Sequence, residues 1–334
     1  MGPDLLRAMQ TPSLAMLLGR SQPALRTMHD AFARALPHES WLAGAIGLPL
    51  DPVASSSPPI ALQKMRQFGM SPEPGVWFLL NPVHIHIARD HLVLTDSRRL
   101  DLSDSEARSL FALAEPIFAE FGKPLVYGDA GTWFLQADNW HDLQTSTPDA
   151  TCGHNVDIWM PKGAAERDWR KVQNEVQMQW HASDVNRGRQ MIGKNPVNSL
   201  WLWAGTSAAL LPQQSRYTDS FNLSGWMADF GKLANRHDHA ATAEEVIAAR
   251  CESGLLLLDS LLEPALGEDM SEWLDRINAL EQSWFGPILQ AMQTGALDQC
   301  RLILTNGTVL NEVPVTRHSL RRFWKKPSLQ GLLE

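Results

Sequence analysis

The chain has 334 residues, with 37 acidic against 29 basic side chains and a formal net charge of −8. That length suffices to bury a sizeable core, and we favour a main domain that carries an insertion over one large domain. The acidic balance, with no basic face long enough to follow a phosphate backbone, excludes non-specific nucleic-acid binding. The basic cluster "RHSLRRFWKK" near the C-terminus is interpreted as a solvated terminal segment.

The cysteines and the N-terminus indicate a cytoplasmic protein. Cys152, Cys251 and Cys300 lie far apart and form no C-x-x-C pair, which is typical of a reducing compartment. The first 20 residues are amphipathic and lack the order of a signal peptide, and the chain contains no apolar run of 18 residues. We therefore expect no membrane span and no membrane partner.

Two helices and a connector are predicted in the first 61 residues. Apolar residues recur at helical spacing on either side of Thr11-Pro12, a pair that suits a helix start. A second helix is predicted in residues 21–37, closed by Pro37. Residues 47–61 are rich in Pro and Ser, so we expect a connector or an exposed loop there.

From Val76 the hydrophobic pattern changes to a period of two, which is typical of strands. Val83, Ile85 and Ile87 alternate with His84 and His86, and a turn at residues 88–91 leads into the apolar residues 92–94. This pattern predicts a β-hairpin.

A helix and two further strands are predicted after the hairpin. Ser103 and Glu106 have the spacing of a capping box, and the helical periodicity behind them is expected to break near Pro116 and to end at Gly122. The strand-like segments "PLVYG" and "TWFLQA" flank the turn "DAG". Residues 76–137 therefore predict a compact β-β-α-β-β unit inserted between other elements.

The second half of the chain changes pattern again. Trp169, Val172, Val176 and Trp180 repeat at helical spacing. Residues 200–203 form a short aromatic run typical of a strand buried on both faces. Helical patterns then alternate with the apolar runs "GLLLLDSLL" and "CRLILTNG", and such alternation predicts a mainly parallel α/β sheet with helices on both faces.

Two groups of side chains have the residue types of a metal site. His84 and His86 point to one side of a strand, with Asp90 and His91 nearby, although an exposed hairpin face accounts for the same pattern. The segment "RHDHAATAEE" supplies the second group, for which loop chemistry and a helix start at Thr242 are the alternative explanation. That group comprises His237, Asp238, His239, Glu244 and Glu245.

The strongest candidate ligand-binding residues are Asn186, Arg189 and Asn198. They lie in a predicted helix-to-strand connection, where backbone N–H groups are also free and a fixed guanidinium suits a phosphate or a carboxylate. The alternative is that the asparagines cap the helix and strand ends. The commonest catalytic motifs, such as G-x-S-x-G, the Walker loop, G-x-G-x-x-G and H-E-x-x-H, are absent from the sequence.

The segment "NEVQMQWHASDVNRGRQMIGKNPVNSLWLWAG" resembles a block of the proteobacterial regulators of pathogenicity factors, type E. Ser183 and Asp184 replace a His and a Pro of that block, and Thr206 follows Gly205 where the block has a further Gly. The residues that fit are Asn174, Glu175, Gln177, Met178, His181, Val185, Asn186, Arg189, Pro196, Val197, Asn198, Ser199 and Trp201 to Trp203. "RHSLRRFWKK" is similar to the C-terminal Arg-Phe-Trp segment of the same group.

The block is also similar to one in the archaeal-type, cofactor-independent phosphoglycerate mutases of the alkaline phosphatase-like superfamily. There it closes an inserted domain and returns the chain to the phosphatase core, and "TPSLAMLLGR" resembles an early stretch of the superfamily. The resemblance implies an alkaline phosphatase-like α/β core in residues 1–70 and 198–334. Residues 71–197 would form an inserted α+β domain.

Departures from that family decide the expected function. Active members hold two divalent cations with Asp and His side chains. The chain begins almost at the Thr-Pro stretch, so the first-strand Asp is expected to be missing. Thr305, Asn306 and Gly307 stand where an Asp-His pair is expected, and Leu79 stands at an arginine position.

We therefore expect a catalytically degenerate mutase-like protein that is not an enzyme and needs no metal or other cofactor. Its role would be regulatory or ligand-binding, with a phosphorylated small molecule or a partner protein as its target. The alternative is an active metal-dependent phosphoglycerate mutase or phosphatase. Its ligands would come from other positions, such as Asp238, His239, Asp259 or Asp269.

Overall fold

The computed structural model describes residues 3–48, 56–89, 91–212 and 215–332. The chain divides into two compact units, each described by itself below. The terminal unit comprises residues 1–29 and 215–334, and the middle unit comprises residues 30–214. The centre of the predicted Pro- and Ser-rich connector, residues 49–55, lies outside the described residues.

The middle unit is built on a four-stranded antiparallel sheet with the order β5-β6-β2-β7. Leu80 of the interior strand β2 lies opposite Trp133 of β6 on one side and Leu202 of β7 on the other. All three side chains are buried, which fits the apolar runs from which these strands form. The strands are β2 (Trp77–Val83), β5 (Leu125–Asp129), β6 (Thr132–Gln136) and β7 (Ser199–Thr206).

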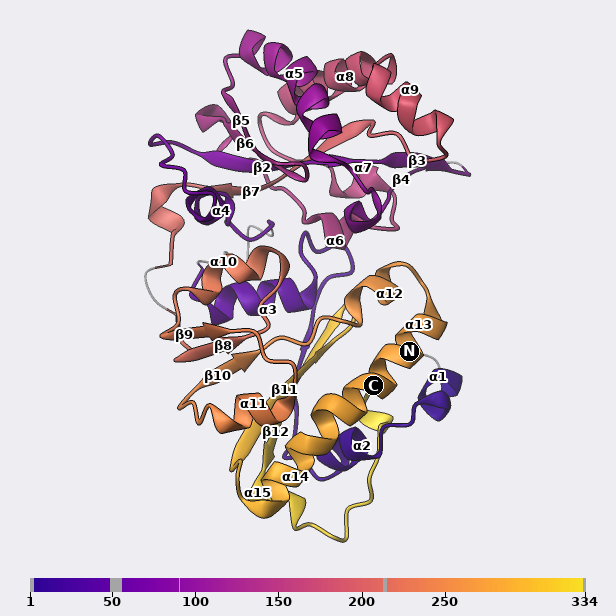
Figure 1. Cartoon of the computed structure of the whole chain (residues 1–334), viewed down its shortest axis with the longest axis vertical. Helices are drawn as coiled ribbons and strands as arrows, with labels where there is room; N and C mark the ends of the chain where they lie inside the picture. The colour runs from indigo at the N-terminus through magenta and orange to yellow at the C-terminus, as the bar shows by residue number, and fades with distance from the viewer. Residues whose placement is uncertain (1–2, 49–55, 90, 213–214, 333–334) are drawn as a thin grey trace. The chain divides into compact units, whose positions relative to one another are not determined.

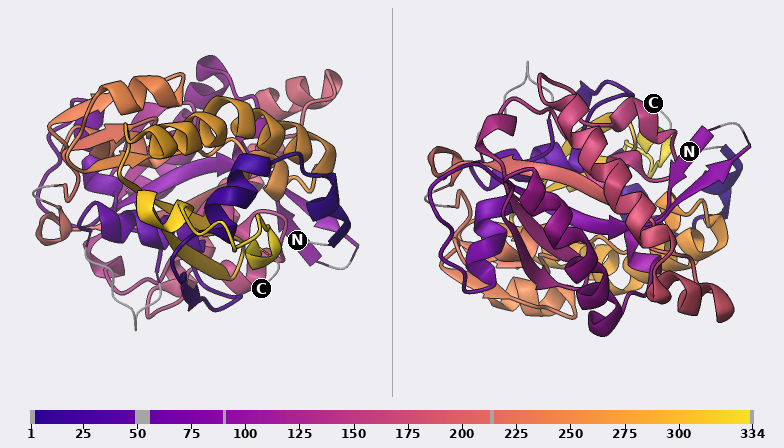
Figure 2. Two further views of the ribbon diagram at one scale, coloured as in Figure 1. Left: turned by 90° about the horizontal axis from the view of Figure 1, so that it is seen from below. Right: turned by 90° about the horizontal axis from the view of Figure 1, so that it is seen from above.

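Helices cover both faces of this sheet (Figures 1 and 2). α5 (Asp104–Glu120) and α8 (Glu166–His181) pack against each other on one face, and α4 (Ala61–Gln67) packs against β2 and β7 on the other. The predicted stripe of α8 is confirmed, because Trp169, Val172, Val176 and Trp180 are all buried. The indole N–H of Trp180 donates to the Leu110 carbonyl of α5 at 3.0 Å, which fixes the two helices together.

The predicted β-β-α-β-β order is confirmed in part, because three strands rather than two precede the helix. β3 (Ile85–Ala88) and β4 (His91–Leu94) form the expected hairpin, and Ser103 and Glu106 form the expected capping box at the start of α5. α5 nevertheless runs unbroken through Pro116. Ala114 and Phe118 are buried on either side of the proline, and their packing offsets the backbone hydrogen bond that proline cannot make.

The remaining elements of the middle unit are short. They are α3 (Pro37–Ala45), η1 (Ser97–Arg99), η2 (Asp138–Trp140), α6 (Pro148–Thr151), α7 (Val156–Trp159), α9 (Asp184–Met191) and η3 (Ala208–Leu210).

The terminal unit contains two three-stranded sheets. One is antiparallel with the order β1-β12-β11, and the other is parallel with the order β10-β8-β9. The antiparallel strands are β1 (Leu25–Met28), β11 (Gln299–Thr305) and β12 (Val309–Thr316). The parallel strands are β8 (Asp219–Phe221), β9 (Arg236–Asp238) and β10 (Gly254–Leu256).

A helical layer closes the apolar core of the terminal unit. α2 begins at Pro12 after Thr11, as the Thr-Pro pair predicts, and the buried Glu281 accepts hydrogen bonds from the Ser13 and Leu14 amides at its N-terminus. A carboxylate is favoured at that end of a helix dipole. The helices are α1 (Pro3–Ala8), α2 (Pro12–Gly19), η4 (Gly225–Met227), α10 (Ala228–Gly231), α11 (Ala243–Ala248), α12 (Leu262–Leu266), α13 (Met270–Leu280), the π-helix η5 (Glu281–Phe285), α14 (Gly286–Thr294), α15 (Arg317–Leu320) and η6 (Gln330–Leu332).

The predicted mainly parallel sheet is wrong. The fold is a mixed α/β arrangement whose described sheets are mostly antiparallel, and parallel pairing among the described strands joins only β8, β9 and β10. The run "CRLILTNG" is the first arm of the β11–β12 hairpin, and strands joined by so short a turn are antiparallel. The helix predicted in residues 21–37 is also wrong, since β1 lies there and pairs with β12.

The compact units have different boundaries from the division expected at residues 70 and 198. β7 pairs with β2, so the run Ser199–Thr206 lies in the middle unit rather than with the C-terminal residues. Arg34 also belongs to the middle unit, where its guanidinium donates to Ser146 Oγ at 2.9 Å. The assignment of the chain to a phosphatase-like core and an inserted domain stays a prediction.

Candidate functional site

Asn186 links the helical layer of the middle unit to the start of β7. Ser183 caps α9 by accepting a hydrogen bond from the Asn186 backbone amide, and Asn186 is buried, with 2% of its surface exposed. Its Nδ2 donates to the carbonyls of Trp180 at 2.9 Å and Val197 at 2.8 Å, and its Oδ1 accepts the Val197 amide at 2.8 Å. Both N–H groups and the oxygen of the side-chain amide therefore bond to the backbone.

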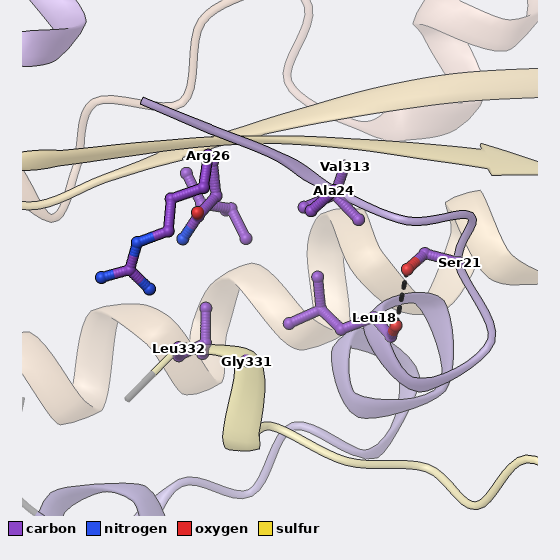
Figure 3. Close-up of a pocket in the computed structure, with 9 residues that line it drawn as sticks. Leu18, Ser21, Ala24, Arg26, Val313, Gly331 and Leu332 are labelled. Carbon is purple, nitrogen blue, oxygen red and sulfur yellow. Dashed lines mark hydrogen bonds between the residues drawn. The ribbon is translucent and has the colours of Figure 1, made fainter. Parts of the chain in front are cut away.

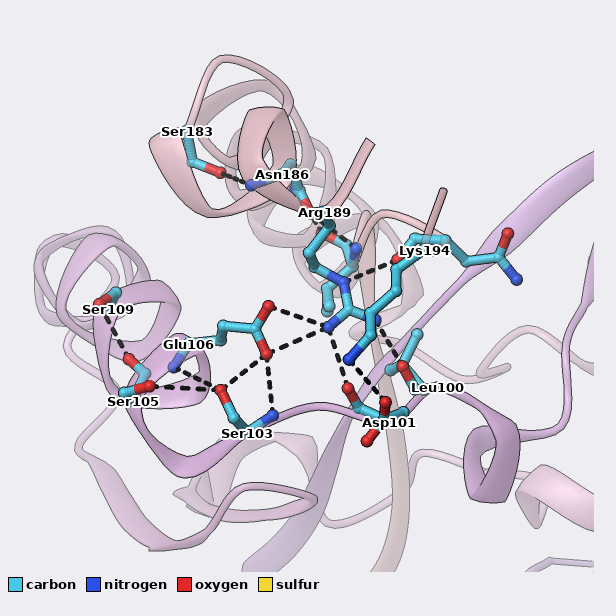
Figure 4. A network of polar contacts seen from close by, with 12 residues as sticks. Leu100, Asp101, Ser103, Ser105, Glu106, Ser109, Ser183, Asn186, Arg189 and Lys194 are labelled. Carbon is cyan, nitrogen blue, oxygen red and sulfur yellow. Dashed lines mark hydrogen bonds and ion pairs between the residues drawn. The ribbon is translucent and has the colours of Figure 1, made fainter. Parts of the chain in front are cut away.

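Arg189 is a buried cation with 1% of its surface exposed, and its fork is filled by partners from within the middle unit (Figure 4). Nε donates to the Asn195 carbonyl at 2.8 Å, and Nη2 donates to the Leu100 carbonyl. Nη1 donates to the Asp101 carbonyl and to the Glu106 carboxylate, both at 3.1 Å. Such an arrangement of carbonyls and one carboxylate satisfies a buried guanidinium without an external anion.

The Glu106 carboxylate is held in its charged form by this network. Burial acts to raise its pKa, but hydrogen bonds from Ser103 and Arg189 outweigh burial, and the pKa lies below its ordinary value. Glu106 thus caps the start of α5 and also forms an ion pair with Arg189.

Asn198 extends the β-sheet by one residue. Its Oδ1 accepts the Ile85 amide at 2.8 Å, and its Nδ2 donates to the Ile85 carbonyl at 2.7 Å. The side chain therefore replaces a backbone pair where β2 passes into β3. In this arrangement Asn186, Arg189 and Asn198 all bond to the chain's own backbone, which favours the structural alternative. Their role as ligand contacts stays a prediction.

The Arg189 network forms one wall of a cavity of about 320 Å³ within the middle unit. Asp101 in this wall has a φ of 48°, a conformation that costs energy for a residue other than glycine. Arg189 holds its carbonyl, and Lys194 pairs with its carboxylate at 2.6 Å. The cavity is lined by Pro82, Ser97, Arg98, Leu100, Asp101, Leu102 and Gly131.

Arg98 is the cation of the cavity lining. Its Nε donates to Asp96 at 2.8 Å, and its terminal nitrogens donate to Asp149 at 2.9 and 3.2 Å. Burial lowers the pKa of Arg98, but the two carboxylates outweigh burial and raise the pKa above its ordinary value. The described bonds use three of its five N–H groups. The sequence did not single out this residue, because one of its two partners, Asp149, comes from a separate segment.

Glu39 is buried close to this ion-pair group. Its carboxylate accepts the Thr147 hydroxyl at 2.6 Å and the Leu36 amide at 2.8 Å. Burial raises the pKa of Glu39 to about 8 and the charge of Asp149 adds to that shift, while the two hydrogen bonds oppose it.

His84 and His86 of the predicted first metal group lie beside each other with nearly parallel rings, whose centroids are 6.0 Å apart, but their Nδ1 atoms have separate partners. His84 Nδ1 lies 2.8 Å from the Pro196 carbonyl, and His86 Nδ1 lies 3.2 Å from Thr95 Oγ1. Burial lowers the pKa of His84, against the effect of that carbonyl. Asp90 lies outside the described residues.

The predicted second metal group lies along β9 and the start of α11 in the terminal unit. His237 Nδ1 lies 3.0 Å from the hydroxyl of the buried Ser220, and Asp238 lies 4.0 Å from Arg236. α11 begins after Thr242 as expected, but its cap is a bond from the Ala241 amide to Glu245. Across the described residues no three or more His, Cys, Asp or Glu side chains form a group that could hold a metal ion.

The segment expected to carry family metal ligands is the turn of the β11–β12 hairpin. Asn306 Oδ1 accepts the amides of Thr308 and Val309 at 2.9 and 2.8 Å, and the Asn306 amide donates to the Val309 carbonyl. Asn306 is thus a turn-forming residue, which is a common use of asparagine. The family's two-metal site requires carboxylates, and these residues do not provide them.

The carboxyl edge of the parallel sheet is where α/β folds commonly bind ligands. There Ser224, just after β8, donates its hydroxyl to Asp259, which follows β10. Asp269, the other alternative ligand, caps α13 by accepting the Glu272 amide at 3.0 Å. The two acidic residues therefore have separate structural partners.

A second cavity, of about 240 Å³, lies within the terminal unit between the antiparallel sheet and the C-terminal segment (Figure 3). Leu18 and Val313 give it an apolar lining, and Arg26 lies at one side. Ser21 Oγ donates to the Leu18 carbonyl at 2.8 Å, so its hydroxyl is used within the chain.

Comparisons with known proteins give a consistent but distant likeness. No family model matches the chain. The probable 2,3-bisphosphoglycerate-independent phosphoglycerate mutase of Geobacter sulfurreducens is 25% identical over 228 residues, which cover 66% of this chain and 54% of that protein. The chain therefore spans about half the length of this curated relative.

Two solved structures are similar to the chain. A protein from Pyrococcus horikoshii has a TM-score of 0.50 at 11% identity, with 93% of this chain and 81% of that chain covered. The cofactor-independent phosphoglycerate mutase of Thermoplasma acidophilum has a TM-score of 0.41 at 16% identity, with 94% and 85% covered. At these identities the first likeness concerns the fold alone.

Only the curated relative bears on the class of protein. Through that relative the chain is similar, at low identity, to cofactor-independent phosphoglycerate mutase-like proteins. Among the described residues no helix is both long and apolar enough to cross a membrane.

Proposed function

We propose that this chain is a phosphoglycerate mutase-like protein that has lost mutase catalysis and acts as a ligand-binding or regulatory module. The observation that carries the proposal is the use of Asn306 as the turn of a β-hairpin, at the position where the resemblance expects metal ligands. A turn asparagine bonded to two backbone amides cannot neutralise a pair of divalent cations. The narrower kinship with type E regulators of pathogenicity factors is part of this proposal.

The proposed ligand is a phosphorylated small molecule that enters the cavity beside Arg98. Ser97 and Arg98 offer a hydroxyl and N–H groups there, which are suitable donors for phosphate oxygens. Asn186, Arg189 and Asn198 would then support the site rather than contact the ligand, because they hold the Leu100–Asp101 wall and its neighbouring strands in place. Alternatively, the proposed regulatory role would be carried out by binding a partner protein at the surface around this cavity.

Thermal unfolding tests the ligand-binding part. A ligand that binds only the folded state raises the melting temperature in proportion to RT ln(1 + [L]/Kd). We expect 3-phosphoglycerate to raise it for the chain and for Arg187→Met, an exposed change on α9, but not for Arg98→Met. Equal shifts in all three proteins would exclude the cavity as the binding site, and no shift at about 10 mM would exclude 3-phosphoglycerate as its ligand.

The alternative function is an active metal-dependent mutase or phosphatase. It is favoured by the contact between Ser224 and Asp259 at the carboxyl edge of the parallel sheet, since a serine beside a carboxylate resembles a nucleophile beside its activating group. Metal analysis of the purified chain separates the two proposals. Two equivalents of bound metal would favour the enzyme.

A further inference from the structure

The C-terminal basic segment is anchored to the terminal unit rather than free in solvent. Arg20 donates to the Leu320 carbonyl at 3.0 Å and to the Lys325 carbonyl at 3.3 Å, and Arg322 donates to the Ser21 carbonyl at 3.2 Å. A Cβ on Gly19 would lie 2.5 Å from the Lys326 carbonyl, so this packing requires glycine. The segment thus has a fixed backbone, unlike the solvated terminus expected from the sequence.

This anchored segment presents two aromatic side chains to solvent. Phe323 is 80% exposed and Trp324 is 68% exposed, and the two rings meet edge to face with centroids 5.2 Å apart. Exposing two neighbouring large apolar side chains is costly in water, and such patches commonly mark interaction sites. We call residues 321–326 the aromatic loop.

Cationic residues flank the aromatic pair in the sequence. Arg321, Lys325 and Lys326 are exposed on either side of it, and the half-buried Arg322 lies next to Phe323. No acidic residue occurs between Glu312 and Glu334, although the whole chain has a formal charge of −8. The aromatic loop is therefore a local cationic surface on an acidic protein, and charge complementarity requires an anionic target.

We propose that the aromatic loop binds the surface of an anionic lipid bilayer. Trp and Phe side chains insert at the level of lipid headgroups, and neighbouring Lys and Arg side chains are attracted by anionic headgroups. A bilayer needs no shape complementarity beyond exposed apolar rings with cations beside them, and Arg321, Lys325 and Lys326 flank Phe323 and Trp324 in the sequence. The loop binds on the surface without spanning the bilayer.

The ring geometry disfavours single-stranded nucleic acid as the target. Successive bases stack on aromatic rings through their flat faces. Phe323 and Trp324 stand at 84° to each other, so their faces cannot support consecutive stacked bases. The bilayer proposal revises our expectation of no membrane partner and does not rest on the proposed mutase-like function.

Sedimentation of the purified chain with lipid vesicles tests this proposal. We expect binding to vesicles that contain about one third phosphatidylglycerol, and at least about tenfold weaker binding to pure phosphatidylcholine. Raising the salt from about 0.1 M to about 0.5 M should weaken binding, because it shortens the screening length. Equal binding to both lipids, or no binding to either, would overturn the proposal.

Variants identify the residues responsible. Phe323→Ala/Trp324→Ala should lower binding at least about tenfold, and Arg321→Gln/Lys325→Gln/Lys326→Gln should remove the preference for anionic lipid. Phe323→Leu/Trp324→Phe should restore much of the binding, since it restores apolar side chains. Met270→Ala, an exposed apolar change in the same unit, should have no effect.

Thermal unfolding of each variant shows whether the chain still folds, and the exposure of all these side chains predicts unchanged melting temperatures. Undiminished vesicle binding by the folded double alanine variant would contradict the proposal. Self-association that depends on Phe323 and Trp324, without any vesicle binding, would assign the loop to contacts between copies of the chain and would overturn the bilayer proposal as well.

Discussion

The sequence motif pointed to Arg189 as an important residue but did not reveal its role in the structure. The motif identified a cation between two asparagines, but the partners of that cation, Leu100, Asp101 and Glu106, lie 83 to 89 residues earlier in the chain. Pairings over such separations leave no local signal. The structural alternative for Asn186 and Asn198, capping and extending secondary structure, could be foreseen because asparagine commonly bonds to nearby backbone.

Arg189→Met is expected to destabilise the middle unit by about 3–5 kcal/mol. The substitution leaves the Glu106 charge and three carbonyls without their donor, and breaking a buried ion pair is costly for that reason. Urea unfolding measures the loss. Arg187→Met on the same helix removes an exposed ion pair and should cost at most about 1 kcal/mol. Equal losses for the two variants would contradict the assigned role of Arg189.

Glu39 should make stability depend on pH. Its pKa is about 8 in the folded chain against 4.5 for the ordinary group, so between these values the folded state holds a proton that the unfolded state has released. This contribution is complete below pH 4.5 and is lost as the pH rises through about 8. As the pH rises, the urea midpoint of the unchanged chain should therefore fall relative to the midpoint of Glu39→Gln. Glu115→Gln, an exposed change, is the control, and parallel profiles for Glu39→Gln and the chain would refute the assignment.

At the level of elements, strong local patterns were predicted well and strand partners poorly. The α8 stripe and the Ser103–Glu106 capping box are confirmed because each depends on spacing within a few residues. The direction of β11 was missed because "LTNG" suits both a strand end and a hairpin turn. β1 was missed because its four residues are exposed and carry no alternating pattern. Sheet direction depends on the connection, which apolar runs do not encode.

The β11–β12 hairpin provides a test at this scale. Asn306→Ala should destabilise the chain by about 1 kcal/mol, because two backbone amides of the turn lose their acceptor. Gln299→Ala, an exposed change on the same strand, should change stability by less than about 0.5 kcal/mol. Chemical denaturation of both variants measures the difference. A stability gain in Asn306→Ala would contradict the turn assignment.

At the scale of the whole molecule, the chain combines one continuous and one discontinuous unit. The middle unit is formed by residues 30–214 alone, with a buried sheet and helices on both faces. The terminal unit requires residues from both ends of the chain. A unit with its own hydrophobic core can fold by itself.

Residues 30–214, expressed alone, should therefore fold cooperatively. We expect a single urea transition and a near-ultraviolet circular dichroism signal from its buried tryptophans. The Arg189→Met substitution should move the urea transition to lower concentration and weaken the circular dichroism signal. Residues 215–334 without residues 1–29 serve as the comparison and should not fold cooperatively, since β1 and α2 are then missing. A molten 30–214 fragment would contradict the division into units.

We propose above that this chain does not catalyse phosphoglycerate interconversion. The most direct measurement is the rate of interconversion of 2- and 3-phosphoglycerate by the purified chain with added Mn²⁺, compared with the rate without protein. A two-metal site acts by positioning and charge stabilisation, so its loss abolishes rather than slows the reaction. We expect no difference between the two rates. Metal-dependent turnover that is lost on Asp238→Ala or His239→Ala would contradict the claim.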